Sequence, residues 1–189
     1  MGKLILIRHA HPQIDQGQSS RVWSLSPAGR DGARRAAEAL TGAGICRIFT
    51  SEETKAIQTG QVIADCLGIE AETAPDLHEH DRTGVGFLDQ AAFARAISGL
   101  FTRRAEVVFG RESGDAAADR LLAAIAEINA RVPDADASLA CVTHGTVMAL
   151  VASRLNGRDG HALWKGLGLP STITLDWDTQ AVLEIVNEY

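Results

Sequence analysis

The sequence predicts an α/β protein built as a three-layer sandwich, with helices on both faces of a mostly parallel central sheet that has an antiparallel edge. Short β-favouring runs alternate along the chain with longer segments that carry helix start and stop signals. Strands separated by helices are joined by crossovers and therefore pair in parallel. The final run, STITLDWDTQAVLEIV, alternates like a hairpin and supplies the antiparallel edge. Because 189 residues suit one hydrophobic core, we expect a single domain over residues 1–189.

Three strands and two helices are predicted in the first half of the chain. The strands are Leu4–Arg8, Arg47–Thr50 and Glu70–Thr73. The run that begins at Leu4 is continuous and apolar, as in a strand buried on both faces. Ser26 suits the N-cap of the first helix and Pro27 its first position. That helix is expected to stop near Gly42 or Gly44.

The second helix is predicted directly after the strand Arg47–Thr50. Ser51 suits its N-cap, and Gly68 closes it. The carboxylates of Glu52 and Glu53 are expected in its first turn, where they complement the positive end of the helix dipole.

The second half predicts further helices, one buried strand and the hairpin. In chain order these are helices at Leu88–Arg104 and Gly114–Val132, the strand Leu139–Thr143, a helix at Thr146–Leu155 and the hairpin Thr172–Val186. Ser113 suits the cap of the helix that it precedes, and Gly157 lies where the last helix stops. The hairpin is expected to turn near Asp178–Gln180, and a polar loop at Ala74–Gly86 separates the two halves.

Composition favours a soluble cytoplasmic protein. Apolar residues make up 46% and charged residues 22%, and no apolar run is long enough to span a bilayer. The N-terminus lacks the pattern of a signal peptide, so we expect no membrane partner. A net charge of -6 disfavours nucleic acid as a partner. Cys46, Cys66 and Cys141 are widely spaced with no CxxC pattern, which suits a reducing compartment.

Chemically distinctive residues follow three of the predicted strands. Arg8 and His9 end the first, Ser51 and a helix carrying Lys55 follow the second, and His144-Gly145 follows Leu139–Thr143. Ligands bind at the carboxyl ends of strands in open α/β sheets. If these strands are parallel neighbours, both histidines and the lysine meet on one rim.

Such a rim suits binding and transfer of a phosphoryl group. Arg8 offers a planar fork of donors for phosphate oxygens, and Lys55 adds a point charge. The helix after His144 supplies backbone N–H donors and a positive dipole end. Nearby cations lower the pKa of His9, which keeps it neutral and nucleophilic. His144 is placed to donate hydrogen bonds to the phosphoryl oxygens.

The leaving alkoxide needs a proton, and the loop DLHEHD offers carboxylates. Glu79 is the best placed, Asp81 is second, and Asp76 and Glu112 are rivals. None of this chemistry requires a metal or another cofactor.

These residues are similar to the motifs of the histidine phosphatase superfamily, the phosphoglycerate mutase-like phosphatases. The family's R-H-G, S-x-x-x-R-A-x-x-T, L-x-E, E-S and V-x-H-G are matched in order by Arg8-His9-Ala10, SEETKAIQT from Ser51 to Thr59, Leu77-His78-Glu79, Glu112-Ser113 and Val142-Thr143-His144-Gly145. The resemblance implies the phosphoglycerate mutase-like fold and hydrolysis of small phosphorylated substrates through a phosphohistidine on His9. It also implies a phosphate pocket formed by Arg8, Lys55 and His144, with Ser51 and Gly145 beside them. Glu79 would protonate the leaving group and then act as base for water.

The chain departs from the family pattern at several positions. Ala10 replaces the usual glycine, which requires a negative φ at that residue. Lys55 replaces the second arginine, so the charge is kept but the two-pronged hydrogen bond is lost. We expect weaker phosphate binding or an altered substrate, with the reaction type retained. His11 stands where a glutamate is common and is expected at the edge of the pocket, and Asp15 is not expected to contact phosphate.

Three alternatives stand beside the phosphatase. A metal-dependent hydrolase would use His9-Ala10-His11 or the run His78–Asp81, but the first pattern belongs to a longer barrel and the second lacks its final histidine. A non-catalytic phospho-ligand binding module would share the fold. A phosphoglycerate mutase-type phosphotransferase would need a lid, and no large insertion supplies one. Specificity is expected from Ala74–Gly86, the following helix and Trp164, which do not identify the substrate, and the sequence does not fix the oligomeric state.

Overall fold

The computed structural model describes residues 2–86, 88–132, 134 and 137–189, and within them one six-stranded sheet has the order β3-β2-β4-β1-β5-β6. The strands are β1 (Lys3–Arg8), β2 (Ile45–Thr50), β3 (Glu70–Thr73), β4 (Ser138–Thr143), β5 (Ser171–Asp176) and β6 (Val182–Val186). The first four pair in parallel, while β5 is antiparallel to β1 and β6 to β5. The predicted mostly parallel sheet with an antiparallel edge is confirmed.

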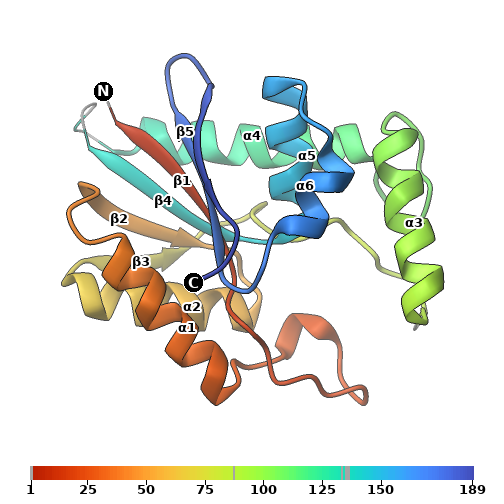
Figure 1. Ribbon diagram of the computed structural model, residues 1–189, viewed down its shortest axis with the longest axis horizontal. Helices are drawn as coiled ribbons and strands as arrows, with labels where there is room; N and C mark the ends of the chain where they lie inside the picture. The colour runs from red at the N-terminus through yellow and green to blue at the C-terminus, as the bar shows by residue number, and fades with distance from the viewer. Residues whose placement is uncertain (1, 87, 133, 135–136) are drawn as a thin grey trace.

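Helices cover both faces of the sheet (Figure 1). They are α1 (Pro27–Ala39), α2 (Thr54–Leu67), α3 (Gln90–Thr102), α4 (Gly114–Ala130), α5 (Gly145–Asn156) and α6 (Gly160–Gly166). Helices α1 and α2 pack on one face, together with Ile5 and Ile7 of β1. Helices α4 and α5 pack on the other face with Leu4 and Leu6. The β1 run is apolar throughout because its alternating side chains fill two separate cores.

Two of the three serines predicted as helix caps, Ser26 and Ser113, form those caps. The Oγ of Ser26 accepts a hydrogen bond from Gly29 N at 3.0 Å, and that of Ser113 accepts one from Ala116 N at 3.1 Å. Gly68 closes α2 in the left-handed region with φ of 68°. The local signals therefore located these helix ends within about two residues.

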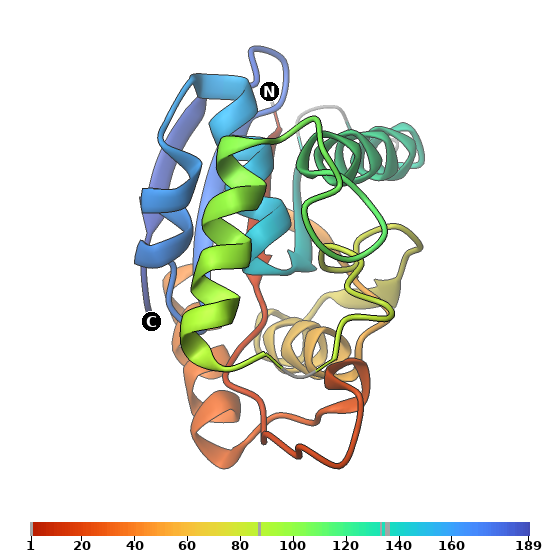
Figure 2. The ribbon, with the colours of Figure 1, turned by 90° about the vertical axis from the view of Figure 1, so that its right-hand side faces the viewer.

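Two short helices were not predicted, namely the 3₁₀ helix at Ser20–Val22 and α6. Helix α6 connects α5 to β5, and α3 packs against it (Figure 2). Seven residues are too few for a 3.6-residue hydrophobic pattern to stand out, so the sequence pattern does not predict α6. Within the described parts of the chain, no helix combines the length and apolar character needed to cross a membrane.

Candidate active site

Strands β2, β4 and β1 are parallel neighbours, and their carboxyl ends form one rim. The backbone N of His9 donates to Thr143 O at 3.0 Å, and that of Ser51 donates to Val142 O at 2.9 Å. His144 follows β4, between the other two strands. The structure thus brings together the strand-end residues that the sequence placed on one rim.

The two histidines face each other in a buried setting. Their ring centroids are 5.1 Å apart at an interplanar angle of 62°, and the exposed fraction is 8% for His9 and 1% for His144. Nδ1 of His9 lies 2.8 Å from Ala10 O. When Nδ1 carries the proton and donates to this carbonyl, Nε2 keeps its lone pair. His9 is therefore oriented as a nucleophile.

Burial and neighbouring charges keep both rings neutral. The pKa of His9 lies well below its usual value, first because of burial, then because of His144, Lys55 and Arg8. Burial likewise lowers the pKa of His144 to about 3, against the opposing effect of Glu79. The direction predicted for His9 is confirmed, but burial has the largest effect, ahead of the cations.

Arg8 lies beside α5 and α6. Its Nη1 donates to Leu167 O, just beyond α6, while its Nε is buried with no hydrogen-bond partner among the described residues. A Cβ on Gly145 would lie 2.8 Å from this Nε, so the glycine gives the guanidinium its space. Burial lowers the pKa of Arg8, partly offset by Glu79. An unpaired buried N–H favours an incoming anion.

Ala10 occupies the position of the family's glycine without backbone strain. Among the described non-glycine residues, only Asp76 and Gln180 have positive φ, so Ala10 meets the condition set for it. Its backbone N donates to Thr59 Oγ1 at 2.9 Å, which ties the end of β1 to α2. Its methyl group is fully buried in the core beneath the rim.

Lys55 lies on the rim, but a carboxylate holds its ammonium. Nζ donates to Glu53 Oε2 and, at 2.7 Å, to Ser20 O. The other carboxylate oxygen of Glu53 lies 3.4 Å from Nε2 of His144. The side chains of Lys55 and Glu53 are only 7% and 8% exposed. The cation expected to contact phosphate is thus paired inside the protein.

This arrangement corrects the prediction for the start of α2. Helix α2 begins at Thr54 with Glu53 as its N-cap residue, so neither Glu52 nor Glu53 lies in its first turn. The Oγ of Ser51 accepts from Glu53 N at 3.3 Å and lies 3.0 Å from Nε2 of His144. Ser51 therefore contacts the second histidine instead of capping the helix.

We expect Lys55→Met to lower the free energy of unfolding by about 3–5 kcal/mol, because it leaves the buried carboxylate of Glu53 without its cation. Urea denaturation followed by circular dichroism measures the loss. The double variant Lys55→Met/Glu53→Gln is expected to regain most of it. The control Arg34→Met, which breaks an exposed pair with Asp31, should cost at most about 1 kcal/mol. Equal losses in the single and double variants would contradict the assigned pairing.

Glu79 is held at the N-terminus of α5. Its carboxylate accepts from the backbone N of Thr146 at 3.2 Å, of Val147 at 3.3 Å and of His80 at 2.9 Å. Arg82 Nη2 lies 3.4 Å from its Oε2. Although burial opposes ionisation, Arg82 leads the effects that lower the pKa of Glu79 to about 2. The amides expected to bind phosphate directly are therefore engaged by this carboxylate.

The rival carboxylates make other contacts. Glu112 pairs with Arg120 at 2.7 Å and accepts from Asp81 N at 2.8 Å. Asp81 accepts from Thr83 N at 2.8 Å. Of the carboxylates considered for the proton donor, Glu79 has direct contacts with the helix that follows His144.

Glu53 and Arg82 are the charged site residues that sequence reasoning missed. Two glutamates at the start of a predicted helix indicate contact with the helix dipole, and this pattern does not reveal that Glu53 is buried in an ion pair. The sequence did contain a signal for an ion pair. Glu53 lies two residues before Lys55, and Lys55 replaces the arginine of the family motif. Arg82 lies inside the loop expected to determine specificity, where no motif distinguishes it from the other polar residues.

The histidines of the proposed metal motif do not converge. His11 is exposed, and its Nδ1 lies 3.0 Å from Pro12 O, whereas His9 turns Nδ1 toward Ala10 O. Across the residues that the structure describes, no three His, Cys, Asp or Glu side chains are grouped so that they could hold a metal ion. His11 thus lies outside the buried cluster.

Comparison with known proteins places these motifs in a family. The model of the histidine phosphatase superfamily (branch 1) matches residues 4–186. No curated protein sequence matches. Native mycobacterial glucosyl-3-phosphoglycerate phosphatase superposes with a TM-score of 0.76 at 19% identity, over 100% of this chain and 99% of that one. Phosphoserine phosphatase from Entamoeba histolytica, in complex with 3-phosphoglyceric acid, has a TM-score of 0.73 at 19% identity, over 98% and 97%. A putative α-ribazole-5′-P phosphatase from Escherichia coli has a TM-score of 0.72 at 20% sequence identity, over 100% of this chain and 98% of that one. At these identities the structural likeness is one of fold.

Proposed function

The chain belongs to the histidine phosphatase superfamily (branch 1), and from that premise we propose that it hydrolyses phosphomonoesters through a transient phosphohistidine on His9, without a metal. One observation carries the proposal. His9 is buried and neutral, its Nδ1 is turned to a backbone carbonyl, and it faces His144 on a rim that also holds Arg8. A neutral imidazole in a cationic pocket is the form that attacks phosphorus.

Two displacements complete the reaction. In the first, Nε2 of His9 forms a bond to phosphorus and the ester P–O bond breaks. Because Glu79 is ionised in the free protein, it takes up the proton of the bound phosphate monoanion and passes it to the leaving oxygen. In the second, water attacks the phosphohistidine, Glu79 takes the water proton, and inorganic phosphate leaves His9. Arg8 is the group proposed to stabilise the negative charge that develops on the phosphoryl oxygens, and His144 supports the reacting ring of His9 from the side. Ser51 and Gly145 serve the pocket indirectly, through His144 and Arg8 respectively.

Small phosphorylated metabolites are the proposed substrates. Structural neighbours are named for glucosyl-3-phosphoglycerate and phosphoserine, which are phosphomonoesters of modest size. We propose one catalytic domain over residues 1–189, supported by the single sheet shared by both cores. A reducing cytoplasm is the proposed location, supported by three cysteines that are all free.

The test is to trap the intermediate. After rapid mixing with a ³²P-labelled phosphomonoester in the presence of a chelator, alkaline quenching should leave one label on His9, stable to base and lost in acid. Peptide mapping assigns the labelled residue. Turnover that the chelator abolishes, or turnover with label absent from His9, would overturn the mechanism. Binding of phosphate without turnover or label would favour the non-catalytic module instead.

A further inference from the structure

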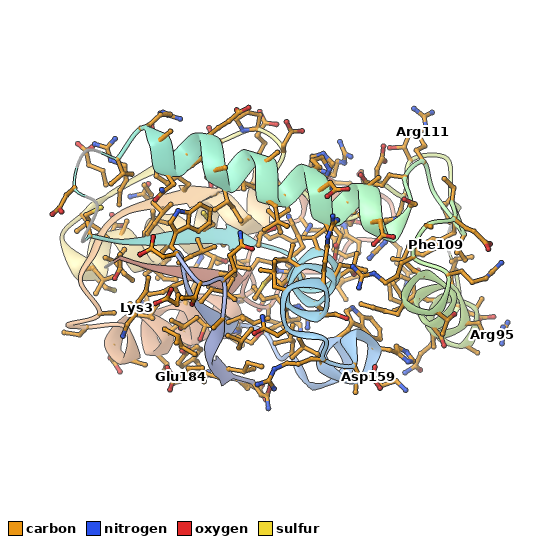
Figure 3. All side chains as sticks on the ribbon, turned by 90° about the horizontal axis from the view of Figure 1, so that it is seen from above. Lys3, Arg95, Phe109, Arg111, Asp159 and Glu184 are labelled. Carbon is orange, nitrogen blue, oxygen red and sulfur yellow. The ribbon has the colours of Figure 1, made fainter. Side chains whose placement is uncertain are left out.

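Arg82 lies beside the site within a group of aromatic side chains from separate segments. Its guanidinium carbon lies 4.9 Å from the ring centroid of Phe93 on α3 and 5.9 Å from that of Phe109. Phe93 in turn lies 6.1 Å from Trp164 of α6. Figure 3 shows Phe109 at the end of the molecule formed by α3. We call these four residues the Arg82 wall.

The guanidinium is only partly used by the protein. Nη2 donates to Thr146 Oγ1 at 2.9 Å and lies 3.4 Å from Glu79 Oε2, and the side chain is 31% exposed. Nε is buried and has no hydrogen-bond partner among the described residues. Nε and Nη2 together form the edge of a guanidinium that binds a carboxylate through two parallel hydrogen bonds. On this edge, Nη2 is shared between Thr146 and Glu79, whereas Nε is unpaired among the described residues.

Glu79 does not need Arg82 for its hydrogen bonds. Three backbone N–H groups already satisfy its carboxylate. Arg82 moreover favours the ionised form, which opposes the transfer of a proton to a leaving group. A substrate that drew Arg82 away from Glu79 would remove this effect. The incoming phosphate, as a like charge, would raise the pKa of Glu79 further.

We propose that Arg82 binds a carboxylate carried by the leaving-group part of the substrate, so that phosphomonoesters of small hydroxy acids are preferred. The inference rests on the proposed function, because Glu79 marks the leaving-group side of the phosphate only if it is the proton donor. The aromatic rings of the Arg82 wall hold the guanidinium by cation–π contact and leave its donors in the plane. Since Nη2 of Arg82 lies 3.4 Å from Glu79 Oε2, a carboxylate close to the ester oxygen would replace Glu79 beside Arg82, and a turn of the guanidinium would bring its buried Nε to the same carboxylate.

A matched pair of substrates tests the inference. 3-Phosphoglycerate and glycerol 3-phosphate differ in that a carboxylate replaces a hydroxymethyl group. For the wild type, kcat/KM should favour 3-phosphoglycerate by about 10- to 100-fold, as expected for a charged bidentate contact. Arg82→Gln should bring the ratio close to one, and Arg82→Lys should give an intermediate ratio. The control Arg21→Gln removes an exposed arginine near the same loop and should keep the wild-type ratio.

Binding separates this inference from the phosphatase mechanism. Calorimetric titration of both compounds into His9→Ala protein should reproduce the preference as a ratio of Kd values, and His9→Ala/Arg82→Gln should lose it. Equal Kd values in His9→Ala, or a preference that survives Arg82→Gln, would overturn the role of Arg82 even if hydrolysis through His9 holds. A preference for a bisphosphate over 3-phosphoglycerate would also overturn it, since the wall would then select a second phosphate. Absence of hydrolysis with the binding preference intact would overturn the proposed reaction alone.

Discussion

Replacing His9 by alanine is expected to lower kcat/KM for any phosphomonoester by about 10⁴-fold or more. The methyl group cannot form the bond to phosphorus, and the substitution removes the ring that is oriented by Ala10 O and lies against His144. His144 cannot substitute, because its Nε2 is directed toward Ser51 and Glu53. Initial rates with p-nitrophenyl phosphate and with an alkyl phosphate measure the loss, and quench labelling should show no phosphoprotein.

His11 provides the matched control. It lies two residues away, on the same loop, but is exposed and has its Nδ1 beside Pro12 O. His11→Ala should keep kcat/KM within about threefold of the wild type, in line with a surface substitution that costs little. Thermal unfolding of both variants excludes a folding defect. Equal losses in the two variants, or turnover by His9→Ala near the wild-type rate, would refute His9 as the nucleophile.

The convergence of the site could be predicted because it depends on topology. A buried strand has a direction, and parallel neighbours end on the same rim, so His9 and His144 meet although 135 residues separate them. Each histidine directly follows its strand, so an error of one residue in the predicted strand end still leaves the histidine on the rim. The fold class and most element ends could be predicted for the same reason, since they rest on local signals and strand pairing.

The charges inside the site could not be predicted in the same way. Whether Glu53 lies in the first turn of α2 or just before it depends on where the helix begins, and helix boundaries are the least reliable part of a sequence interpretation. A shift of two residues turned an exposed dipole partner into a buried partner of Lys55 and His144. The surroundings of Arg82 could not be predicted either, because its loop, α3 and α6 are far apart in the sequence and no local pattern shows that they meet in space.

Replacing Glu79 by glutamine should separate its two roles. As proton donor, Glu79 matters for an alkyl leaving group, whose alkoxide cannot leave unprotonated, and matters little for p-nitrophenolate, which is stable as an anion. We therefore expect kcat/KM for an alkyl phosphate to fall by about 10²- to 10⁴-fold, and that for p-nitrophenyl phosphate to fall far less. Ratios of the two rates in wild type and variant measure the difference.

As base for water, Glu79 acts in a step common to all substrates. Its pKa of about 2 in the free protein means that it is ionised at neutral pH, the form that accepts a proton. In Glu79→Gln, p-nitrophenyl phosphate should phosphorylate His9 quickly while hydrolysis of the phosphohistidine becomes slow. Stopped-flow absorbance should then show a burst of about one p-nitrophenolate per protein molecule, followed by slow turnover, and quenching should trap the phosphohistidine.

The control for Glu79 is Glu112→Gln, because Glu112 pairs with Arg120 and Asp81 N in the neighbouring loop. That variant is expected to lose stability while keeping the wild-type ratio of alkyl to p-nitrophenyl rates and showing no burst. If Glu79→Gln instead slowed both substrates equally without a burst, Glu79 would be needed to form the pocket and would not move protons. Such a result would shift the proton-transfer role to another carboxylate near His144, and Glu53, 3.4 Å from its Nε2, would be the next group to replace.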